Sequence, residues 1–446
     1  MGIIPLLYTF TNMKRISSLL FLFSCLAGGA QSPATAQSIA RIGEPLPAWQ
    51  EGTLDLHHIN TGRGNTAFYI LPDGTTMLWD AGELDPTDPR TTSRRNTPER
   101  PDSSRHPYEW VADYIRRVAP GKAQNGIDYA LISHFHDDHF GSWYPAAPLS
   151  ADGKYALTGI TGVGDAIPFH HLLTRDWHYP VDPATQLRGR PATTGYVRTW
   201  NNYLAFVDAQ VSKGMKTEFV RAGSRTQIHL VHHPEKWAAC YVQNIKSNGW
   251  IWTGADSSVK QHFPPVDPAD RKTWPDENPL SNAIVIHYGP FSYYTGGDNP
   301  GNVFLGDAPW RDVETEIAKA VGEVDIATMD HHGNRDALNE NFIRGLRPRV
   351  WIEQTWTADH PGHEVLIRAT SQLLYPGPRD LFATNFMEAN ELVIGPLVAQ
   401  SYKSRQGHIV VRVLPGGGEY YVIILDDGDS NSRVKQVFGP YRAKGK

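Results

Sequence analysis

The stretch LISHFHDDHFG, residues 131–141, places three histidines and two aspartates within six positions after a short apolar run. If that run is a strand, His134, His136, Asp138 and His139 lie in the loop that follows its end. Imidazole nitrogens and carboxylate oxygens are suitable zinc ligands. A single His-x-His after a strand is often a solvated turn, but the complete His-x-His-x-Asp-His set is typical of a metal site. The stretch therefore predicts a centre for one or two divalent ions.

The composition is that of a large folded protein with little net charge. Of the 446 residues, 40% are hydrophobic and 20% are charged, which is enough for a sizeable core. The formal net charge of −5 argues against broad electrostatic binding of nucleic acid. We therefore expect no nucleic-acid partner.

The N-terminus has the pattern of a secretory signal peptide. Residues 13–15, Met-Lys-Arg, precede the apolar run ISSLLFLFSCLAGGA, and the small-x-small site ATA follows. We expect residues 1–36 to be removed and the mature protein to be secreted or periplasmic, without a transmembrane segment. A lipoprotein anchored at Cys25 is the alternative, which Phe23 fits poorly. Cleavage leaves only Cys240, so no internal disulfide is expected.

Strand-like runs dominate the chain from residue 52 onward, with a few helices between them. The predicted strands are TLDLHHI (53–59), the two arms of TAFYILPDGTTMLWDAG (66–82), IDYALISH (127–134), TQIHLVHH (226–233), AACYVQNI (238–245), GWIWTG (249–254), NAIVIHYG (282–289), FSYYTGGD (291–298) and the hairpin 408–425. Helical spacing occurs in residues 108–119, 199–211 and 313–321. Two similar halves of this kind predict an α/β fold in which two mixed β-sheets face each other with helices outside.

Several motifs resemble those of the metallo-β-lactamase superfamily. HFHDDH matches its His-x-His-x-Asp-His signature at every fixed position, and the other landmarks follow in the right order. LWDAG has Asp80 where the superfamily has an aspartate that supports the metal loop by hydrogen bonds. YYTGGD has Asp298 where a carboxylate bridges two metals, and ATMDHHGN has His331 and His332 where the last histidine ligand lies.

The resemblance implies an αββα sandwich that holds one or two Zn²⁺ ions or another divalent metal. The implied metal ligands are His134, His136, Asp138, His139, Asp298 and His331. The implied catalytic residues are Asp138, which would orient the attacking hydroxide, and His332. The sequence alone leaves open which of His331 and His332 binds metal and which contacts the substrate.

The second half of the chain narrows the resemblance. ENPLSNAIVIHYGPFSYYTGGD followed by DIATMDHHGN is similar to the branch that contains competence-type DNA-uptake hydrolase domains and phosphorylcholine esterases. This implies a hydrolase that uses a metal-bound hydroxide on a phosphodiester or another ester. A β-lactam or lactone hydrolase is the alternative reaction. A non-catalytic metal-binding protein of the same fold is the alternative class.

The resemblance also suggests a domain organisation. Residues 37–51 are expected to be a linker, and residues 52–363 a metallo-β-lactamase-like catalytic domain with an insertion around 145–280. We assign residues 364–446 to the same domain, because their predicted hairpin is suited to complete a sheet.

One departure from the superfamily concerns the third histidine of the first metal. Between His139 and Asp298 no histidine stands in the Gly-His context that many members have. His232 and His233, after the predicted strand 226–233, are the best candidates, although each is more typical of a surface or core histidine. Otherwise the first metal has fewer protein ligands, or the site holds one metal.

Two further groups of residues lie outside the signature. WTADHPGHEV contains Asp359, His360 and His363, which form a polar loop or reach the substrate or a metal. Trp143 and Tyr144 follow the metal loop and are suited to an aromatic wall or to the core.

Overall fold

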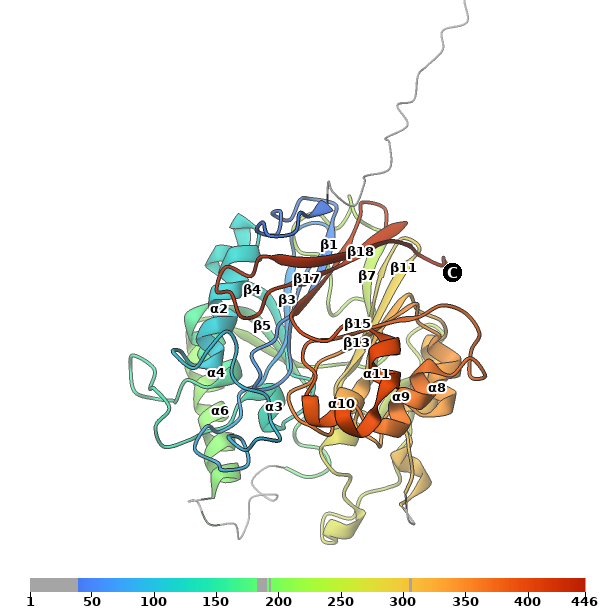
Figure 1. Cartoon of the computed structure of the whole chain (residues 1–446). Helices are drawn as coiled ribbons and strands as arrows, with labels where there is room; N and C mark the ends of the chain where they lie inside the picture. The colour runs from blue at the N-terminus through green and yellow to red at the C-terminus, as the bar shows by residue number, and fades with distance from the viewer. Residues whose placement is uncertain (1–38, 183–190, 192–193, 305–306, 446) are drawn as a thin grey trace, which may run out of the picture. The chain divides into compact units, whose positions relative to one another are not determined.

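A computed structural model of the chain describes residues 39–182, 191, 194–304 and 307–445 (Figure 1). The predicted signal peptide, residues 1–36, and the alternative anchor at Cys25 lie outside these residues. The described residues belong to one compact unit. No helix in this part of the chain combines the length and the apolar character that crossing a membrane requires.

Two mixed β-sheets, each with nine strands among the described residues, form the centre of the fold. The first sheet contains β1 (Leu54–His58), β2 (Thr66–Ile70), β3 (Thr76–Ala81), β4 (Ile127–Leu131), β5 (Phe169–Thr174), β6 (Lys216–Phe219), β16 (His408–Val413), β17 (Glu419–Leu425) and β18 (Val434–Arg442), in the order β18-β17-β16-β1-β2-β3-β4-β5-β6. The second contains β7 (Cys240–Ser247), β8 (Trp250–Trp252), β9 (Val259–Gln261), β10 (Ala283–Tyr288), β11 (Phe291–Gly296), β12 (Ile326–Thr328), β13 (Val350–Glu353), β14 (Asp380–Ala383) and β15 (Tyr402–Ser404), in the order β15-β14-β13-β12-β11-β10-β7-β8-β9.

Each sheet joins a parallel half to an antiparallel half. Strands β3 to β6 are parallel neighbours, and so are β11 to β15. The remaining neighbours, including the β16–β17 hairpin that pairs with β1, are antiparallel. Because parallel strands end at the same edge of a sheet, the loops after β3, β4, β11, β12 and β13 are free to meet.

Helices cover the outer faces of both sheets (Figure 1). The α-helices are α2 (Pro107–Val118), α3 (Asp137–Phe140), α4 (Gly159–Ala166), α6 (Gly195–Ser212), α7 (Glu314–Val321), α8 (Glu340–Leu346), α9 (His363–Thr370), α10 (Glu388–Ile394) and α11 (Pro396–Ser401). Short 3₁₀ turns are η1 (Gly121–Asn125), η2 (Arg271–Thr273), η3 (Asn278–Leu280), η4 (Pro309–Arg311) and η5 (Asp330–Gly333). Helix α2 shows why such a segment is helical. Pro107 occupies its first turn, where the missing N–H costs nothing, and Glu109 accepts a hydrogen bond from the His106 N–H.

Three apolar layers follow from the alternation of side chains along the strands. Leu56, Trp79 and Ile284 belong to the layer between the two sheets. Phe68 packs outward with residues of α2, α4 and α6, and Trp351 packs outward with residues of α7, α8 and α9. The order helix, sheet, sheet, helix confirms the predicted αββα sandwich.

The predicted strand at residues 226–233 is wrong. Ile228 and Leu230 are buried between the sheets, as the alternation requires, but the segment is irregular. Its last three backbone N–H groups donate to the Thr75 hydroxyl and the Asp73 carboxylate, over 2.8 to 3.1 Å. Side chains of a neighbouring turn thus take the backbone hydrogen bonds that a sheet neighbour would have supplied.

Candidate metal centre

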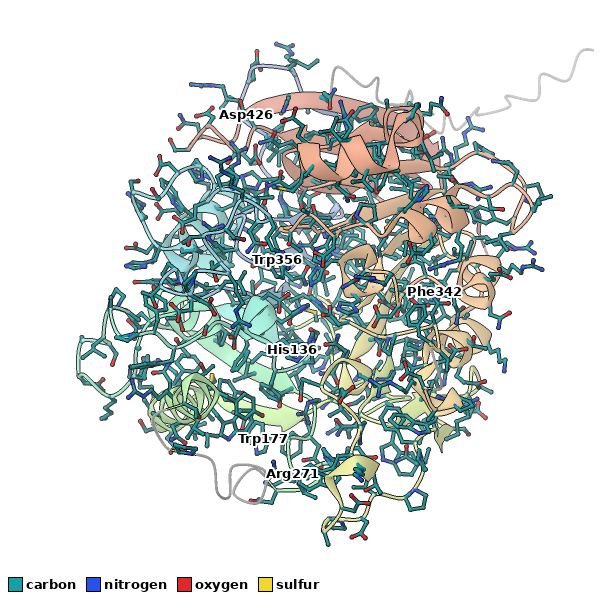
Figure 2. All side chains as sticks on the ribbon, turned by 60° about the horizontal axis from the view of Figure 1, so that its bottom comes forward. His136, Trp177, Arg271, Phe342, Trp356 and Asp426 are labelled. Atoms are coloured by element: carbon teal, nitrogen blue, oxygen red, sulfur yellow. The ribbon has the colours of Figure 1, made fainter. Side chains whose placement is uncertain are left out.

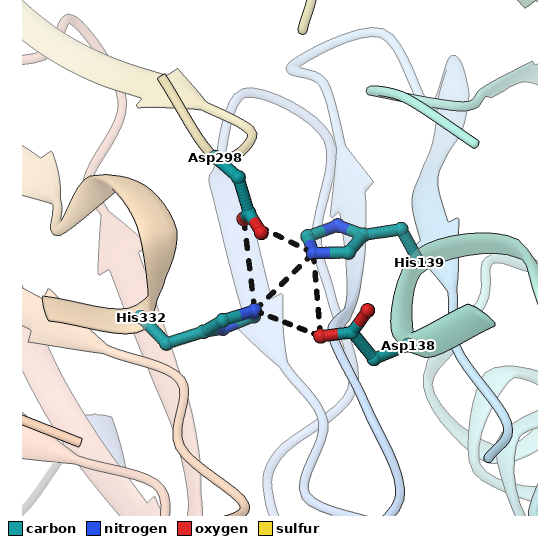
Figure 3. Close-up of side chains that lie close together, drawn as sticks. All are labelled: Asp138, His139, Asp298 and His332. Carbon is teal, nitrogen blue, oxygen red and sulfur yellow. Dashed lines mark hydrogen bonds and ion pairs between the residues drawn. The ribbon is translucent and has the colours of Figure 1, made fainter. Parts of the chain in front are cut away.

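Loops from both sheets converge at the carboxyl ends of their parallel strands. His134, His136 and helix α3 follow β4, Asp298 follows β11, and η5 follows β12. Asp298 Oδ1 lies 3.1 Å from His139 Nε2, although the two residues are 159 positions apart along the chain. The meeting of these distant segments, which the motif order predicts, is present in the structure (Figure 3).

Asp138, His139, Asp298 and His332 form a compact set, here called the four-donor group. His139 Nε2 lies 3.2 Å from His332 Nε2, and His332 Nε2 lies 3.2 Å from Asp138 Oδ2 and 3.6 Å from Asp298 Oδ1. Ligands at about 2.1 Å from a tetrahedral zinc ion lie about 3.4 Å from one another. Two nitrogens and two carboxylate oxygens at these spacings therefore fit one divalent ion.

His134, His136 and Asp298 form a second set, here called the three-donor group. His134 Nε2 lies 3.1 Å from His136 Nδ1 and 3.6 Å from Asp298 Oδ2. Asp298 thus turns one carboxylate oxygen toward each group, as a bridging carboxylate would. This group has three donors, one fewer than the four-donor group. The missing donor corresponds to the third histidine in a Gly-His context, which this sequence lacks.

Asp80 holds His139, a member of the four-donor group, in its orientation. Its carboxylate accepts hydrogen bonds from the Ser133 N–H at 2.6 Å and the Ser133 hydroxyl at 2.8 Å, and its Oδ2 lies 2.9 Å from His139 Nδ1. A proton on His139 Nδ1 leaves the opposite nitrogen, Nε2, free to face the centre. Asp80 is buried and has a φ of 57°, which is a strained value for this residue type. The hydrogen-bonding role expected for Asp80 is confirmed.

Gly82, the last residue of LWDAG, allows the metal loop to approach. A Cβ at this position would lie 1.8 Å from the carbonyl oxygen of Asp138. That same carbonyl accepts a hydrogen bond from the Asn65 N–H at 2.7 Å. Any larger residue at position 82 would push helix α3 away from the strand ends.

An ion pair between buried Arg175 and half-buried Glu277 holds the loop between the first two histidines. Glu277 accepts a hydrogen bond from the Phe135 N–H at 2.8 Å and forms a bidentate pair with Arg175, with both contacts at 2.7 Å. Bidentate geometry of this kind is strong and directional. His134 and His136 therefore stand on either side of a fixed backbone position.

Two consecutive left-handed residues aim His331 and His332 differently. Their φ values are 47° and 54°. His332 donates from Nδ1 to the Gln354 carbonyl at 2.8 Å and enters the four-donor group. His331 Nδ1 pairs with Asp336 at 2.6 Å. Its Nε2 lies 3.7 Å from Asp298 Oδ2 but is not close to every member of either donor group. The geometry favours His332 as the ligand of the four-donor group, whereas the implied ligand set named His331 and the sequence alone left the choice open.

The charges of the centre suit metal binding. Burial alone would lower the pKa of His139, but the three carboxylates around it raise that pKa well above its ordinary value. Burial favours protonated Asp138 and Asp298, yet the neighbouring histidines hold the pKa of both below the ordinary range. Burial and nearby His139 hold the pKa of His134 well below its ordinary value. Ionised Asp138 and Asp298 and neutral His134 are in the forms that bind metals, whereas His139 must release a proton when an ion binds.

A cavity of about 490 Å³ opens onto the centre. His136, Asp138, His331 and His332 form its floor. Its walls come from two loops, one before α2, with residues 84–96, and one after β13, with residues 356–360. In Figure 2 the molecule is tilted so that the bottom of Figure 1 comes forward. His136 and Trp356, which both line this cavity, are labelled there.

The two wall loops are joined by backbone hydrogen bonds. The Thr97 N–H donates to the Trp356 carbonyl at 2.9 Å, and the Ala358 N–H donates to the Arg95 carbonyl at 2.7 Å. Arg95 also forms an ion pair with Asp359 at 3.0 Å. The polar loop before α2 is thus part of the cavity that faces the centre.

His232 and His233 do not supply a third histidine. His232 Nε2 lies 3.7 Å from Asp128 Oδ2, near the amino end of β4, whereas the centre lies past its carboxyl end. Neither histidine belongs to a donor group among the described residues. Tyr144 is 2% exposed, with its hydroxyl 3.0 Å from Glu83, so it belongs to the interior and does not form a wall of the cavity.

The fold and this site define an αββα protein with a candidate centre for two divalent ions. No family model matches the chain, and no curated protein matches it. Among solved structures, CmlA, a diiron β-hydroxylase from Streptomyces venezuelae, is similar with a TM-score of 0.35 and 12% identity, over 82% of this chain and 55% of that chain. Zn²⁺-bound PqqB from Methylobacterium extorquens is similar with a TM-score of 0.33 and 10% identity, over 80% of this chain and 99% of that chain. The chain spans little more than half the length of CmlA.

Proposed function

We propose that the protein is a secreted or periplasmic metal-dependent hydrolase of the metallo-β-lactamase superfamily that cleaves a phosphodiester or another ester. The observation that carries this proposal is the Asp298 carboxylate, which turns one oxygen to each of two donor groups beside an open cavity. The similarity to the competence-type and phosphorylcholine-esterase branch supports the ester as substrate.

A bound zinc ion would supply the chemistry that the side chains lack, because it lowers the pKa of a water ligand from about 15.7 to about 7 and polarises a carbonyl or phosphoryl oxygen. The donor set of two imidazoles and two carboxylates fits such an ion. Zn²⁺ is our first choice, and another divalent ion fits the same donors.

The residues around the centre divide the remaining work. Asp138 is the carboxylate of the four-donor group that also lines the cavity, so it is suited to accept a hydrogen bond from the attacking water and to orient it. His331 lines the same cavity, with its Nδ1 held by Asp336, and is suited to contact the substrate. Asp298 keeps the two groups at a fixed separation.

Metal content and turnover test the proposal together. Purified protein should carry one or two equivalents of metal per chain, measured by inductively coupled plasma mass spectrometry. It should hydrolyse bis(4-nitrophenyl) phosphate, lose this activity with a chelator and regain it with Zn²⁺. His136→Ala should reduce both metal content and turnover, whereas His233→Ala, a half-exposed histidine outside the site, should change neither.

The substrate panel separates the alternatives. Faster turnover of nitrocefin or of a lactone than of the phosphodiester would favour the lactamase or lactonase reaction. Stoichiometric metal without any turnover would favour the non-catalytic binding protein. Protein without metal, in which His136→Ala changes nothing, would end the proposal.

A further inference from the structure

The loop after β13 encloses the metal-facing histidine of η5. His360 is 3% exposed, and its ring stacks on that of His332, with centroids 4.9 Å apart and planes inclined by 24°. Trp356 stands edge-on to both rings, at 6.1 Å from His332 and 5.4 Å from His360. His332 therefore has an aromatic surface against its face and another at its edge.

His332 needs such support because its ring has only one hydrogen bond outside the four-donor group. Its Nδ1 donates one hydrogen bond, to the Gln354 carbonyl, and its backbone is in the left-handed region. One hydrogen bond fixes one atom of the ring but leaves the ring free to tilt about that contact. A ring packed flat against the imidazole removes this freedom, which sets the direction of Nε2.

His360 is itself held from behind. Asn390, a buried residue of α10, donates from its side-chain amide to the carbonyl of His360 at 2.8 Å and to that of Pro361 at 3.1 Å. The Gly362 N–H donates to the Gly333 carbonyl at 2.8 Å, which ties the loop to η5. The chain of contacts thus runs from α10 through His360 to His332.

We propose that His360 is a positioning residue that holds His332 in the four-donor group, so that the metal affinity of this group depends on a ring that donates no ligand atom. The inference rests on the proposed metal centre. Residues that orient metal ligands typically change metal affinity by about 10- to 100-fold when they are lost.

Substitutions at position 360 separate packing from the loss of a polar group. His360 Nδ1 is buried without a hydrogen-bond partner, so His360→Phe keeps the stacked ring and gives up no hydrogen bond at that atom. His360→Ala removes the ring. His287→Ala is the matched control, because His287 stacks on Tyr241 in nearly the same geometry, 4.6 Å and 24°, in β10 and β7.

The experiment measures Zn²⁺ affinity by competition with a chromophoric chelator, and the visible spectrum of the Co²⁺ form. We expect His360→Ala to bind the tighter ion about 10- to 100-fold more weakly and to alter the Co²⁺ spectrum. His360→Phe and His287→Ala should stay close to the wild type. Asn390→Ala, which loosens the loop from behind, should shift affinity in the direction of His360→Ala and by less, and it provides the answer if His360→Ala does not fold.

Three results would overturn the inference. Wild-type affinity in His360→Ala or, if that variant does not fold, in Asn390→Ala would mean that the ring does not position His332. An equal loss in His360→Phe and His360→Ala would mean that stacking is not the cause. Wild-type protein that binds no metal would instead remove the proposed function, and with it the basis of this inference.

Discussion

Replacement of Asp80 by asparagine tests how the candidate metal centre is held. Asp80 is fully buried, with Oδ1 accepting from the Ser133 N–H and Oδ2 lying 2.9 Å from His139 Nδ1. Asparagine keeps the shape but exchanges one accepting oxygen for a donating NH₂ group. If the remaining oxygen stays with the Ser133 N–H, the amide faces the Nδ1–H of His139, donor against donor. His139 must then carry its proton on Nε2, the atom that faces the four-donor group.

The size of the effect follows from the lost contact. A hydrogen bond to a charged group contributes about 1.5–3 kcal/mol net. At about 1.4 kcal/mol per factor of ten, this predicts metal binding weaker by about one to two powers of ten. The same range is typical for loss of a residue that orients a metal-bound histidine, about 10- to 100-fold.

Chelator competition with Zn²⁺ on Asp80→Asn and Asp73→Asn is the decisive assay. Asp73 is also a buried carboxylate, and it accepts hydrogen bonds in the turn between β2 and β3, away from the centre. We expect Asp73→Asn to lower the free energy of unfolding and leave metal affinity unchanged. Wild-type affinity in folded Asp80→Asn would refute the orienting role, and equal losses in both variants would show a general destabilisation instead.

Three other predictions concern the histidine pair and the carboxylates Glu353 and Glu277. His331→Ala should keep the metal content and lower kcat, whereas His332→Ala should lose about one metal equivalent, as mass spectrometry and kinetics would show. Burial raises the pKa of Glu353 to about 8, so the folded protein keeps a proton that the unfolded chain releases above about pH 4.3. Stability should therefore fall as pH rises from about 4 to about 8, and urea titration of Glu353→Gln should give a gain of up to about 4 kcal/mol at about pH 7 that vanishes near about pH 4. Arg175→Ala leaves Glu277 without its partner and should cost about 3 kcal/mol in the same titration, a cost that Glu277→Gln in the Arg175→Ala background should reduce.

The sequence predicts the first half of the site well because its determinants are local. HFHDDH follows a buried strand, and a parallel strand leaves its C-terminal loop at one edge of the sheet. Asp80 is at the end of the adjacent strand, so its position beside His139 follows from the same order. Asp298 also follows a strand of this kind. Its position at the site can therefore be predicted, although it lies far from the first motif along the chain.

The remaining parts of the site depend on contacts that no local pattern contains. His331 and His332 have the same side chain, and two left-handed backbone conformations decide which one enters the four-donor group. Glu277, Gln354 and Trp356 approach the centre through loops that only tertiary packing brings together. No spacing in the sequence marks them as part of a site.

The predicted strand 226–233 failed for a related reason. The alternation of Ile228 and Leu230 correctly indicates which side chains are buried. It does not indicate that Asp73 and Thr75 would take the backbone N–H groups of this segment. Side-chain periodicity reports burial, and hydrogen-bond partners have to be learned from the fold.

The backbone hydrogen bonds between the two wall loops have a consequence for how this pocket changes in evolution. Thr97 and Arg95 form backbone hydrogen bonds with Trp356 and Ala358. The two wall loops are therefore joined through their main chains, although they are far apart in the sequence. An insertion in one wall loop would displace these hydrogen-bonding groups and so shift the other wall loop. New substrate preferences should therefore arise through paired mutations in both wall loops. Libraries that randomise only one wall loop should recover few active clones.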